Sequence, residues 1–378
     1  MLHPVFPTPS IPAPDVTPLF GARWLGMGRL RDVKPQIPAD VLLHAGPPLD
    51  DEPAEPVVKA GAQALLFEGR FDNLHAAENY LRGNRDMMRP AQEFGVVTPL
   101  AQVVSATMPV LVVGNQREKY CAPLSDGPAP ALRFGSSDPA CLARLRALSE
   151  EISPLVNAHL DRKPIDIADV VADALNRGDE CHARTEQANA AVLRHLKTSL
   201  PPSMIEKLAT NPGFVLPLIM AASAWWLHHN ALEADSVTMA GGNGRQFGIK
   251  LRGEAGWRTA AATPPVGTMF AGQQSRPPLG AIGDSAVVDF CGLGGQSLAA
   301  APALLEDWKA HLPTDAAERH LMVCEPSTAI VNIRQVMASG LSPIINLAIL
   351  DASEGGLIGR GFYTPPLSLF APTFGDGA

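Results

Sequence analysis

The pattern of apolar and polar positions changes twice after residue 40. In the first stretch, short apolar runs alternate with Gly and Pro: residues 41–45 and 109–113 predict strands, and residues 57–66 have helical spacing. One strand ends before Gly46, a second lies at 109–113, and the helix lies between them in the sequence. This alternation is typical of a layered α/β arrangement. We therefore expect an α/β domain over residues 39–137.

Residues 138–231 carry helical periodicity with few strand signals between the periodic stretches. The pattern predicts helices over residues 141–148, 165–176, 179–200, 202–209 and 214–232. The pair Pro201–Pro202 begins one of them, as proline in a first helical turn does. This part of the chain is expected to form an all-helical module.

Strand signals and Gly-rich turns return in residues 232–378. Apolar runs predict strands over residues 247–252, 286–290 and 344–350. Helical spacing predicts helices over residues 297–311 and 333–339. The predicted fold class is α+β, with two mixed domains bracketing the helical module. A parallel nucleotide-binding sheet is not expected.

Residues 1–38 contain eight prolines. Proline at this density removes backbone donors and interrupts helices and ladders, so the segment predicts an extended N-terminal arm. The arm could be loose or could lie across a neighbouring surface. A second sign of a partner is the apolar helix that ends in Trp225–Trp226, which needs a surface to cover it.

Composition narrows the class of protein. With 46% hydrophobic and 18% charged residues, the chain can bury a large core. A net charge of −8 argues against a nucleic-acid partner, although local arginines can still bind an anion. The apolar run 214–227 is too short to span a membrane, and no signal peptide is visible. Five scattered cysteines without a CxxC pair favour reduced thiols and a cytoplasmic location.

Several short segments resemble, in order, the YlbE/YahG-like family of bacterial proteins. They are Leu42–Pro48, Ser105–Val110, Leu132–Gly135, Gly178–Arg184, Gln246–Ile249, Ile282–Ala286, Gly292–Gly295 and Ala299–Ala303. One such motif would be weak, but their order is specific. Together they span about residues 40–370.

The resemblance implies one subunit of an oxamate carbamoyltransferase, which interconverts carbamoyl phosphate plus oxamate with oxalurate plus phosphate in purine and allantoin catabolism. It implies a small anionic substrate and a partner subunit similar to succinyl-CoA synthetase, with no metal or organic cofactor. It also implies a multidomain α+β fold with a helical module. Self-association stays open.

The chain departs from the family pattern in three places. The Pro-rich arm replaces a longer N-terminal domain, and no histidine lies near 91–94, where the family has a His-rich segment. After Asn346, many relatives continue Thr-Gly-Ile-Ala-His, but this chain has the apolar run 347–350. If those histidines do chemistry, this protein acts on another small acid or is a non-catalytic partner subunit.

Two Gly-rich segments are candidates for an anion site. Backbone N–H groups at a helix start bind phosphate and carboxylate well. The motifs are neither a Walker A loop nor a dinucleotide fingerprint. The residues expected to cradle carbamoyl phosphate or a carboxylate are Gly283, Asp284, Ser285, Gly292, Gly294 and Gly295. The alternative is that these glycines only permit tight turns and close packing.

The candidate catalytic residues are Asp179 and His182. On a helix over residues 179–200 they would form one polar stripe with Glu186 and Asn189. His182 would move a proton or polarise the carbamoyl carbonyl, and Asp179 would orient it. A capped, solvated helix face is the alternative. We expect this segment and the Gly-rich loops to face one cleft.

Arginine is suited to bidentate recognition of carboxylates and phosphates. Arg184 and Arg245, within or beside matched motifs, are predicted anion clamps, although a single arginine is more often part of a surface ion pair. His44, at a strand end before Gly46, is either a site residue or a buried structural histidine. The pair His228–His229 lacks the further ligands of a zinc site.

Overall fold

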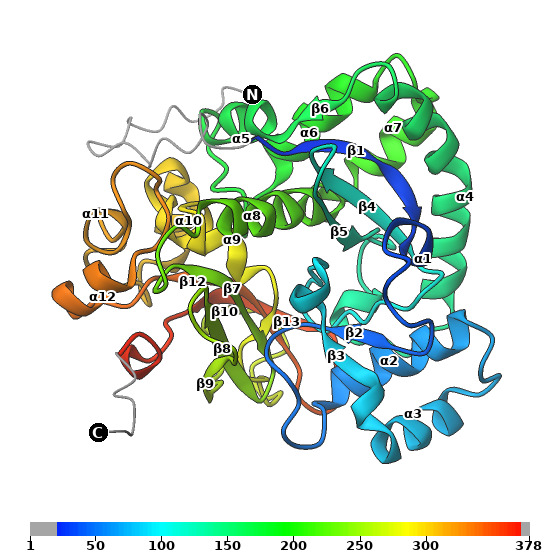
Figure 1. Ribbon diagram of the computed structural model, residues 1–378, viewed down its shortest axis with the longest axis horizontal. Coiled ribbons are helices and arrows are strands. Elements are labelled where there is room, and N and C mark those ends of the chain that lie inside the picture. The colour runs from blue at the N-terminus through cyan, green and yellow to red at the C-terminus, as the bar shows by residue number, and fades with distance from the viewer. Residues whose placement is uncertain (1–20, 372–378) are drawn as a thin grey trace.

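Four small sheets organise residues 21–371, the part of the chain that the computed structural model describes (Figure 1). Among these residues, three sheets are antiparallel throughout and the fourth is a parallel pair. The protein is therefore an α+β protein, as the sequence predicts. A single doubly wound sheet is not present in the described range.

The first sheet has the order β5-β4-β1-β6. Its strands are β1 (Arg23–Arg29), β4 (Pro109–Gly114), β5 (Lys119–Pro123) and β6 (Ile165–Asp166). Every residue of β4 is buried, which explains its uninterrupted apolar run. The sheet lies beside helix α8 (Leu216–Asn230) in the upper half of Figure 1.

The described part of the predicted arm is not a loose tail. Residues 23–33 form β1 and the short helix α1 (Leu30–Val33), and Trp24 is fully buried. The chain has no proline between residues 18 and 35, so this stretch keeps its backbone donors and pairs on both sides with β4 and β6. Residues 1–20 of the predicted arm lie outside the described residues.

The other sheets form the lower half of the molecule in Figure 1. One has the order β11-β7-β8-β9 and another the order β10-β13-β12, and β2 pairs with β3 in parallel. Their strands are β2 (Leu42–His44), β3 (Met88–Pro90), β7 (Val237–Asn243), β8 (Gln246–Leu251), β9 (Arg258–Ala261), β10 (Val266–Met269), β11 (Ile282–Gly283), β12 (Ile345–Leu350) and β13 (Leu357–Tyr363).

Helices surround and connect the sheets. Besides α1 and α8 they are α2 (Glu55–Phe67), α3 (Leu74–Gly83), α4 (Ala140–Leu160), α5 (Ile167–Leu175), α6 (Glu186–Leu196), α7 (Pro202–Ala209), α9 (Ala286–Phe290), α10 (Pro302–Trp308), α11 (His320–Val323) and α12 (Ile333–Ser339). Among the described residues, no helix is both long and apolar enough to cross a membrane.

Helix α8 passes through the middle of the molecule, next to β4, β5, β7 and α9 (Figure 1). Its residues from Pro217 to Leu227 are all buried, including Trp225 and Trp226. The protein's own elements therefore cover this helix. The expectation that Trp225–Trp226 requires a partner surface is wrong.

Several predicted elements differ from the structure: the helix predicted over 297–311 is confined to α10, Pro302–Trp308, and two other differences bear on the site. The run 286–290 is helix α9 instead of a strand, because a run of five mostly apolar residues does not distinguish the two. The helix predicted over 179–200 begins only at Glu186. Before it, the carboxylate of Glu180 accepts hydrogen bonds from the backbone N–H groups of residues 182–184, which holds them in a loop.

Candidate active site

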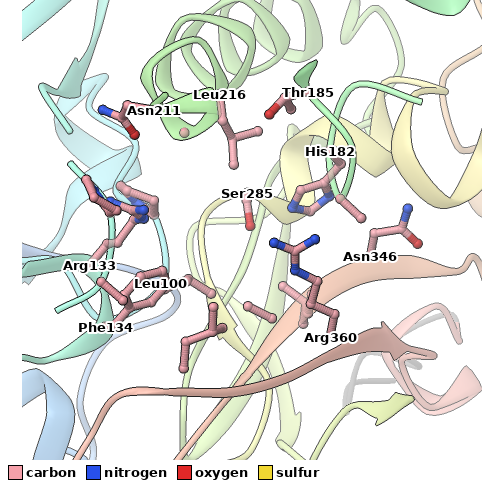
Figure 2. Close-up of a pocket in the computed structure, with 18 of the residues that line it drawn as sticks. Leu100, Arg133, Phe134, His182, Thr185, Asn211, Leu216, Ser285, Asn346 and Arg360 are labelled. Carbon is pink, nitrogen blue, oxygen red and sulfur yellow. The ribbon is translucent and has the colours of Figure 1, made fainter. Parts of the chain in front are cut away.

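A cavity of ≈ 290 Å³ opens between segments that lie far apart in the sequence (Figure 2). Its walls come from residues 99–100, 128–129, 133–134, 182–183, 185–186, 210–211, 213, 216, 285, 346–348, 357 and 360. In Figure 2, Arg133 and Phe134 lie on one side, His182, Asn346 and Arg360 on the other, and Ser285 between them. Both halves of the sequence thus contribute to a single hollow.

His182 is held by a carboxylate that sequence reasoning did not select. Its Nδ1 atom donates to Oδ2 of Asp289 at 2.8 Å, and both side chains are buried. Burial alone would lower the pKa of His182, but the charge and hydrogen bond of Asp289, with the charge of Glu180, raise it above its usual value. With Nδ1 engaged, Nε2 is the nitrogen left to exchange a proton with a ligand.

Asp289 is fixed from several directions. Its Oδ1 atom accepts hydrogen bonds from the backbone N–H groups of Gly295 at 2.7 Å and Asn346 at 3.0 Å. A carboxylate with both oxygens occupied in this way cannot turn freely. It therefore sets the orientation of the His182 ring, which is the part that the sequence assigned to Asp179.

The loop that carries His182 is organised by Glu180. Besides the backbone groups of residues 182–184, its carboxylate accepts a hydrogen bond from Nδ2 of Asn346 at 2.8 Å. Burial raises the pKa of Glu180, although these hydrogen bonds and the charge of His182 oppose the rise. Asn346 thereby joins the His182 loop to strand β12.

Gly294 leaves room for the His182–Asp289 pair. A Cβ atom there would overlap the carboxylate of Asp289 and come within 3.1 Å of the Cβ atom of His182. The residue also has a φ of +54°, a conformation that non-glycine residues rarely adopt. Glycine is required here for close packing, which is the alternative reading of the Gly-rich loop.

Gly294→Ala is expected to lower the free energy of unfolding by about 3 kcal/mol, because it adds an overlap to backbone strain. Gly272→Ala is the matched control: Gly272 also has positive φ, +78°, but nothing lies within 4 Å of its added Cβ atom. The control should lose only about 1 kcal/mol. Chemical denaturation of both variants measures the difference, and equal losses would refute the packing argument.

Two arginines supply positive charge from different elements. Arg133, in a 3-10 turn over Leu132–Phe134, donates from Nη1 to the carbonyl of Gly127 at 2.7 Å and stacks over the Phe134 ring. Arg360, on β13, is exposed at the cavity. Within residues 21–371, neither forms an ion pair with a carboxylate, although the exposed Glu186 also lines the cavity. The nearby charge of Asp126 balances part of the charge of Arg133, whereas the charge of Arg360 is available to an anionic ligand.

Of the residues predicted to cradle an anion, only Ser285 lines this cavity. Asp284 is fully buried beside it and accepts hydrogen bonds from the backbone of Gly46 at 2.8 Å, the backbone and hydroxyl of Thr98 at 2.8 and 3.2 Å, and the amide of Gln92 at 2.6 Å. Burial raises the pKa of Asp284 to about 7 against these bonds. It fastens three loops together.

The predicted cradle of backbone N–H groups is occupied by the protein itself. The N–H of Gly294 donates to the carbonyl of Glu180 at 2.7 Å, and that of Gly295 to Asp289. Added Cβ atoms would meet backbone of Leu100 at Gly283 and of Ala329 at Gly292. These four glycines lie in close packing away from the cavity wall, so an exposed anion cradle is not formed there.

The remaining predicted site residues lie elsewhere. Asp179 is buried, has its pKa raised to about 6 by burial, and caps α6 by accepting from the backbone of Gln187 and Ala188. Arg184 does not line the cavity, and Arg245 lines a separate hollow. His44 is buried against the carbonyl of Ala45, and burial lowers its pKa to about 4. His44 therefore fits the alternative of a buried structural histidine.

Sequence reasoning missed Asp289, Asn346 and Arg360 as site residues. Asp289 had a visible signal, because it is the one charged residue in the apolar run 286–290. A carboxylate inside such a run must be paired when it is buried. Nothing local distinguishes Arg360 from other arginines.

Comparison with known proteins finds bacterial relatives over most of the chain. A family model described as "Oxamate carbamoyltransferase subunit AllG" matches residues 87–285, which include His182 and Ser285. The protein of that name from Escherichia coli (strain K12) is 30% identical over 368 residues, 87% of each chain. "Uncharacterized protein YahG" of the same organism is 28% identical over 379 residues, 92% of this chain and 80% of the relative.

A solved structure has the same fold. It is the crystal structure of a conserved protein of unknown function from Enterococcus faecalis V583, with a TM-score of 0.82 and 26% sequence identity. The match covers 94% of both chains. The arrangement of sheets and helices described above is therefore shared almost over its whole length.

Proposed function

Because the chain belongs to the oxamate carbamoyltransferase subunit AllG family, as its motifs predicted, we propose that it works as a subunit of a carbamoyltransferase complex. The proposed reaction interconverts carbamoyl phosphate plus oxamate with oxalurate plus phosphate. The proposed site is the cavity that contains His182, Arg133 and Arg360.

The observation that carries the proposal is that two arginines from opposite sides of the cavity face a buried histidine–carboxylate pair. Carbamoyl phosphate and oxamate are both anions, so a site for their reaction must hold two negative groups. Arg133 and Arg360 offer one guanidinium from each side of the cavity. Holding both reactants in one orientation supplies much of the rate gain in a group transfer.

His182 supplies the proton transfer that carbamoyl transfer needs. The attacking group loses a proton as it bonds to the carbamoyl carbon, and the departing group gains one in the reverse direction. Nε2 of His182 can take and return that proton while Asp289 stabilises the ring when it is charged. The raised pKa of His182 makes it a stronger base than an ordinary histidine.

The size of the cavity suits small reactants. Its ≈ 290 Å³ lies near the lower end of the range for ligand pockets, about 300–1,000 Å³. The proposed reaction involves no organic cofactor.

A related small acid as acceptor is the second candidate, and one observation favours it. Leu347 and Ala348, in the run where the resembled family often has Thr-Gly-Ile-Ala-His, both line the cavity. An apolar wall there would accept an acid bearing an apolar group more readily than oxamate. The alternative of a non-catalytic subunit predicts no effect of cavity substitutions on turnover.

The function is tested by measuring phosphate release from carbamoyl phosphate with oxamate and with related acids as acceptors. The purified chain is assayed alone and together with its genomic-neighbour subunits, one of them expected to resemble succinyl-CoA synthetase. We expect negligible transfer by the chain alone and turnover by the assembled complex. Absence of transfer with every acceptor, in a folded and assembled complex, would refute the proposal.

Arg360→Ala is expected to raise the KM for an anionic reactant about 10–100-fold in the assembled complex, because it removes a charge-assisted contact worth about 1.5–3 kcal/mol. The matched control is Arg245→Ala, which removes an exposed arginine from a hollow elsewhere. Steady-state kinetics on both variants separate the cavity from general loss of positive charge. An unchanged KM for both reactants in Arg360→Ala would exclude it from binding.

A further inference from the structure

The side chain of Ser285 is nearly buried, yet it hydrogen-bonds none of the residues that the structure describes. The residue is 2% exposed and lines the cavity, with its hydroxyl in the middle of Figure 2. Buried polar groups are normally paired with protein or water, so an unpaired hydroxyl in a cavity is available to a ligand. It is also free to turn onto a neighbouring base.

Ser285 and Asp289 lie one helical turn apart. The backbone at Ser285 already has helical angles, φ −60° and ψ −15°, and α9 follows directly. Residues four positions apart share a helix face, with their Cβ atoms about 5–6 Å from each other. Asp289 on that face binds Nδ1 of His182, and the same ring lines the cavity with Ser285. Hydroxyl, imidazole and carboxylate thus gather at one place.

The turn before Ser285 is rigid. Asp284 ties it to three loops through four hydrogen bonds. Gly283, with a φ of +119°, brings the same turn against the backbone of Leu100, a contact too close for any side chain. A reacting group has to be held within about 0.5 Å of its working position, and this support provides such placement.

We propose that Ser285 is a nucleophile that carries the carbamoyl group covalently, with His182 as its base and Asp289 orienting His182. This inference rests on the proposed carbamoyl transfer. The arrangement follows the general pattern of an activated hydroxyl: nucleophile, adjacent base, and a third group that fixes the base. In a direct transfer between two bound reactants, by contrast, no covalent intermediate on the protein would form.

The step balances without any further reactant. Oγ of Ser285 attacks the carbamoyl carbon, its proton passes to Nε2 of His182, and the bond from that carbon to the phosphate oxygen breaks to release phosphate. The nitrogen of the acceptor amide then attacks the carbamoyl carbon. The Oγ–carbon bond breaks, His182 returns its proton to Oγ, and the proton lost by the amide leaves to solvent.

The test uses the assembled complex and carbamoyl phosphate without an acceptor. After rapid acid quenching and proteolysis, mass spectrometry is expected to find the peptide containing Ser285 with one hydrogen replaced by a carbamoyl group. Isotope exchange between phosphate and carbamoyl phosphate should also proceed without an acceptor. Ser285→Ala should abolish both signals and lower kcat by at least about 10³-fold. Ser203→Ala is the control, because Ser203 is an exposed serine outside the cavity, and it should change neither signal nor kcat.

The outcomes separate this proposal from the proposed function. Transfer without adduct or exchange, with Ser285→Ala retaining its kcat, would overturn the covalent step and leave the carbamoyltransferase intact. An adduct on Ser285 without transfer to oxamate would support the nucleophile and redirect the search to another acceptor. Neither adduct nor transfer would overturn both. Ser285→Cys keeps a nucleophilic atom at this position. An adduct on this variant would show that substitution at position 285 does not prevent folding.

Discussion

His182→Asn should lower the rate of carbamoyl transfer by about 10²–10⁴-fold, the usual contribution of a positioned acid–base group. The Asn amide can still donate to Asp289, so the buried carboxylate keeps a partner, but no atom remains that takes up a proton. The rate is measured as phosphate release in the assembled complex. Unchanged thermal unfolding and assembly would show that the loss is chemical, and a change of less than about threefold would exclude His182 from proton transfer.

The same residue sets the expected pH dependence. As a base His182 must be neutral, and its pKa is raised by Asp289 despite opposition from burial. Activity should therefore fall as the pH decreases through that raised pKa, so the acid limb lies above about 6.5, the ordinary pKa of histidine. Asp289→Asn removes the negative charge and should move the limb to lower pH. A limb that stays in place would mean that another group titrates.

Asp284→Ala should lower the free energy of unfolding by about 3–5 kcal/mol at pH 5, among the largest effects of a single substitution in this protein. It would leave buried donors of Gly46, Thr98 and Gln92 without an acceptor, each costing about 1–3 kcal/mol with partial relaxation. Chemical denaturation measures the loss. Asp51→Ala, at an exposed position, is the control and should change stability by less than about 0.5 kcal/mol.

The loss at Asp284 should shrink as the pH rises. Its pKa in the folded protein, about 7, lies above the value of about 3.9 for an unfolded chain. A raised carboxyl pKa means that the protonated form favours folding: this contribution is complete below about pH 3.9 and is lost as the pH rises through about 7. Repeating the denaturation at pH 8 should show a smaller difference from the unsubstituted protein. A larger difference at pH 8 than at pH 5 would contradict the predicted direction of the pH dependence.

Local patterns predicted much of the fold and little of the site. Helix α7, Pro202–Ala209, has the predicted bounds, and β4 differs from its prediction by one residue. Both are decided by short-range chemistry, namely proline at a first helical turn and a continuous apolar run. The family and the α+β class followed from motifs and from such elements.

The arrangement around His182 depends on contacts between distant residues. His182 and Asp289 are 107 positions apart, and Glu180 and Asn346 are 166 apart. Each pair is buried and specific, but no periodicity or spacing connects its members. The sequence could mark His182 and Ser285 as reactive types in matched motifs, whereas their partners became visible only when the chain was folded.

The Gly-rich loop shows why a motif can indicate the right region for the wrong reason. Its glycines were predicted to expose N–H groups to a phosphate. Instead, Gly294 makes space for the Asp289 carboxylate, and the N–H of Gly295 holds that carboxylate in place. The loop therefore acts on the site through Asp289, and a substitution there would alter the histidine before it altered any bound anion.

Strand β1 has a consequence for synthesis of the protein on the ribosome. It is among the first described segments to be made, yet its neighbours in the sheet are β4, residues 109–114, and β6, residues 165–166. The strand with the buried Trp24 thus has to wait for about 85 further residues before β4 is complete and for about 137 before β6 is complete. During that interval an unpaired strand is exposed to association with other chains. Slowing translation before residue 166 is therefore expected to reduce the yield of folded protein more than slowing it later.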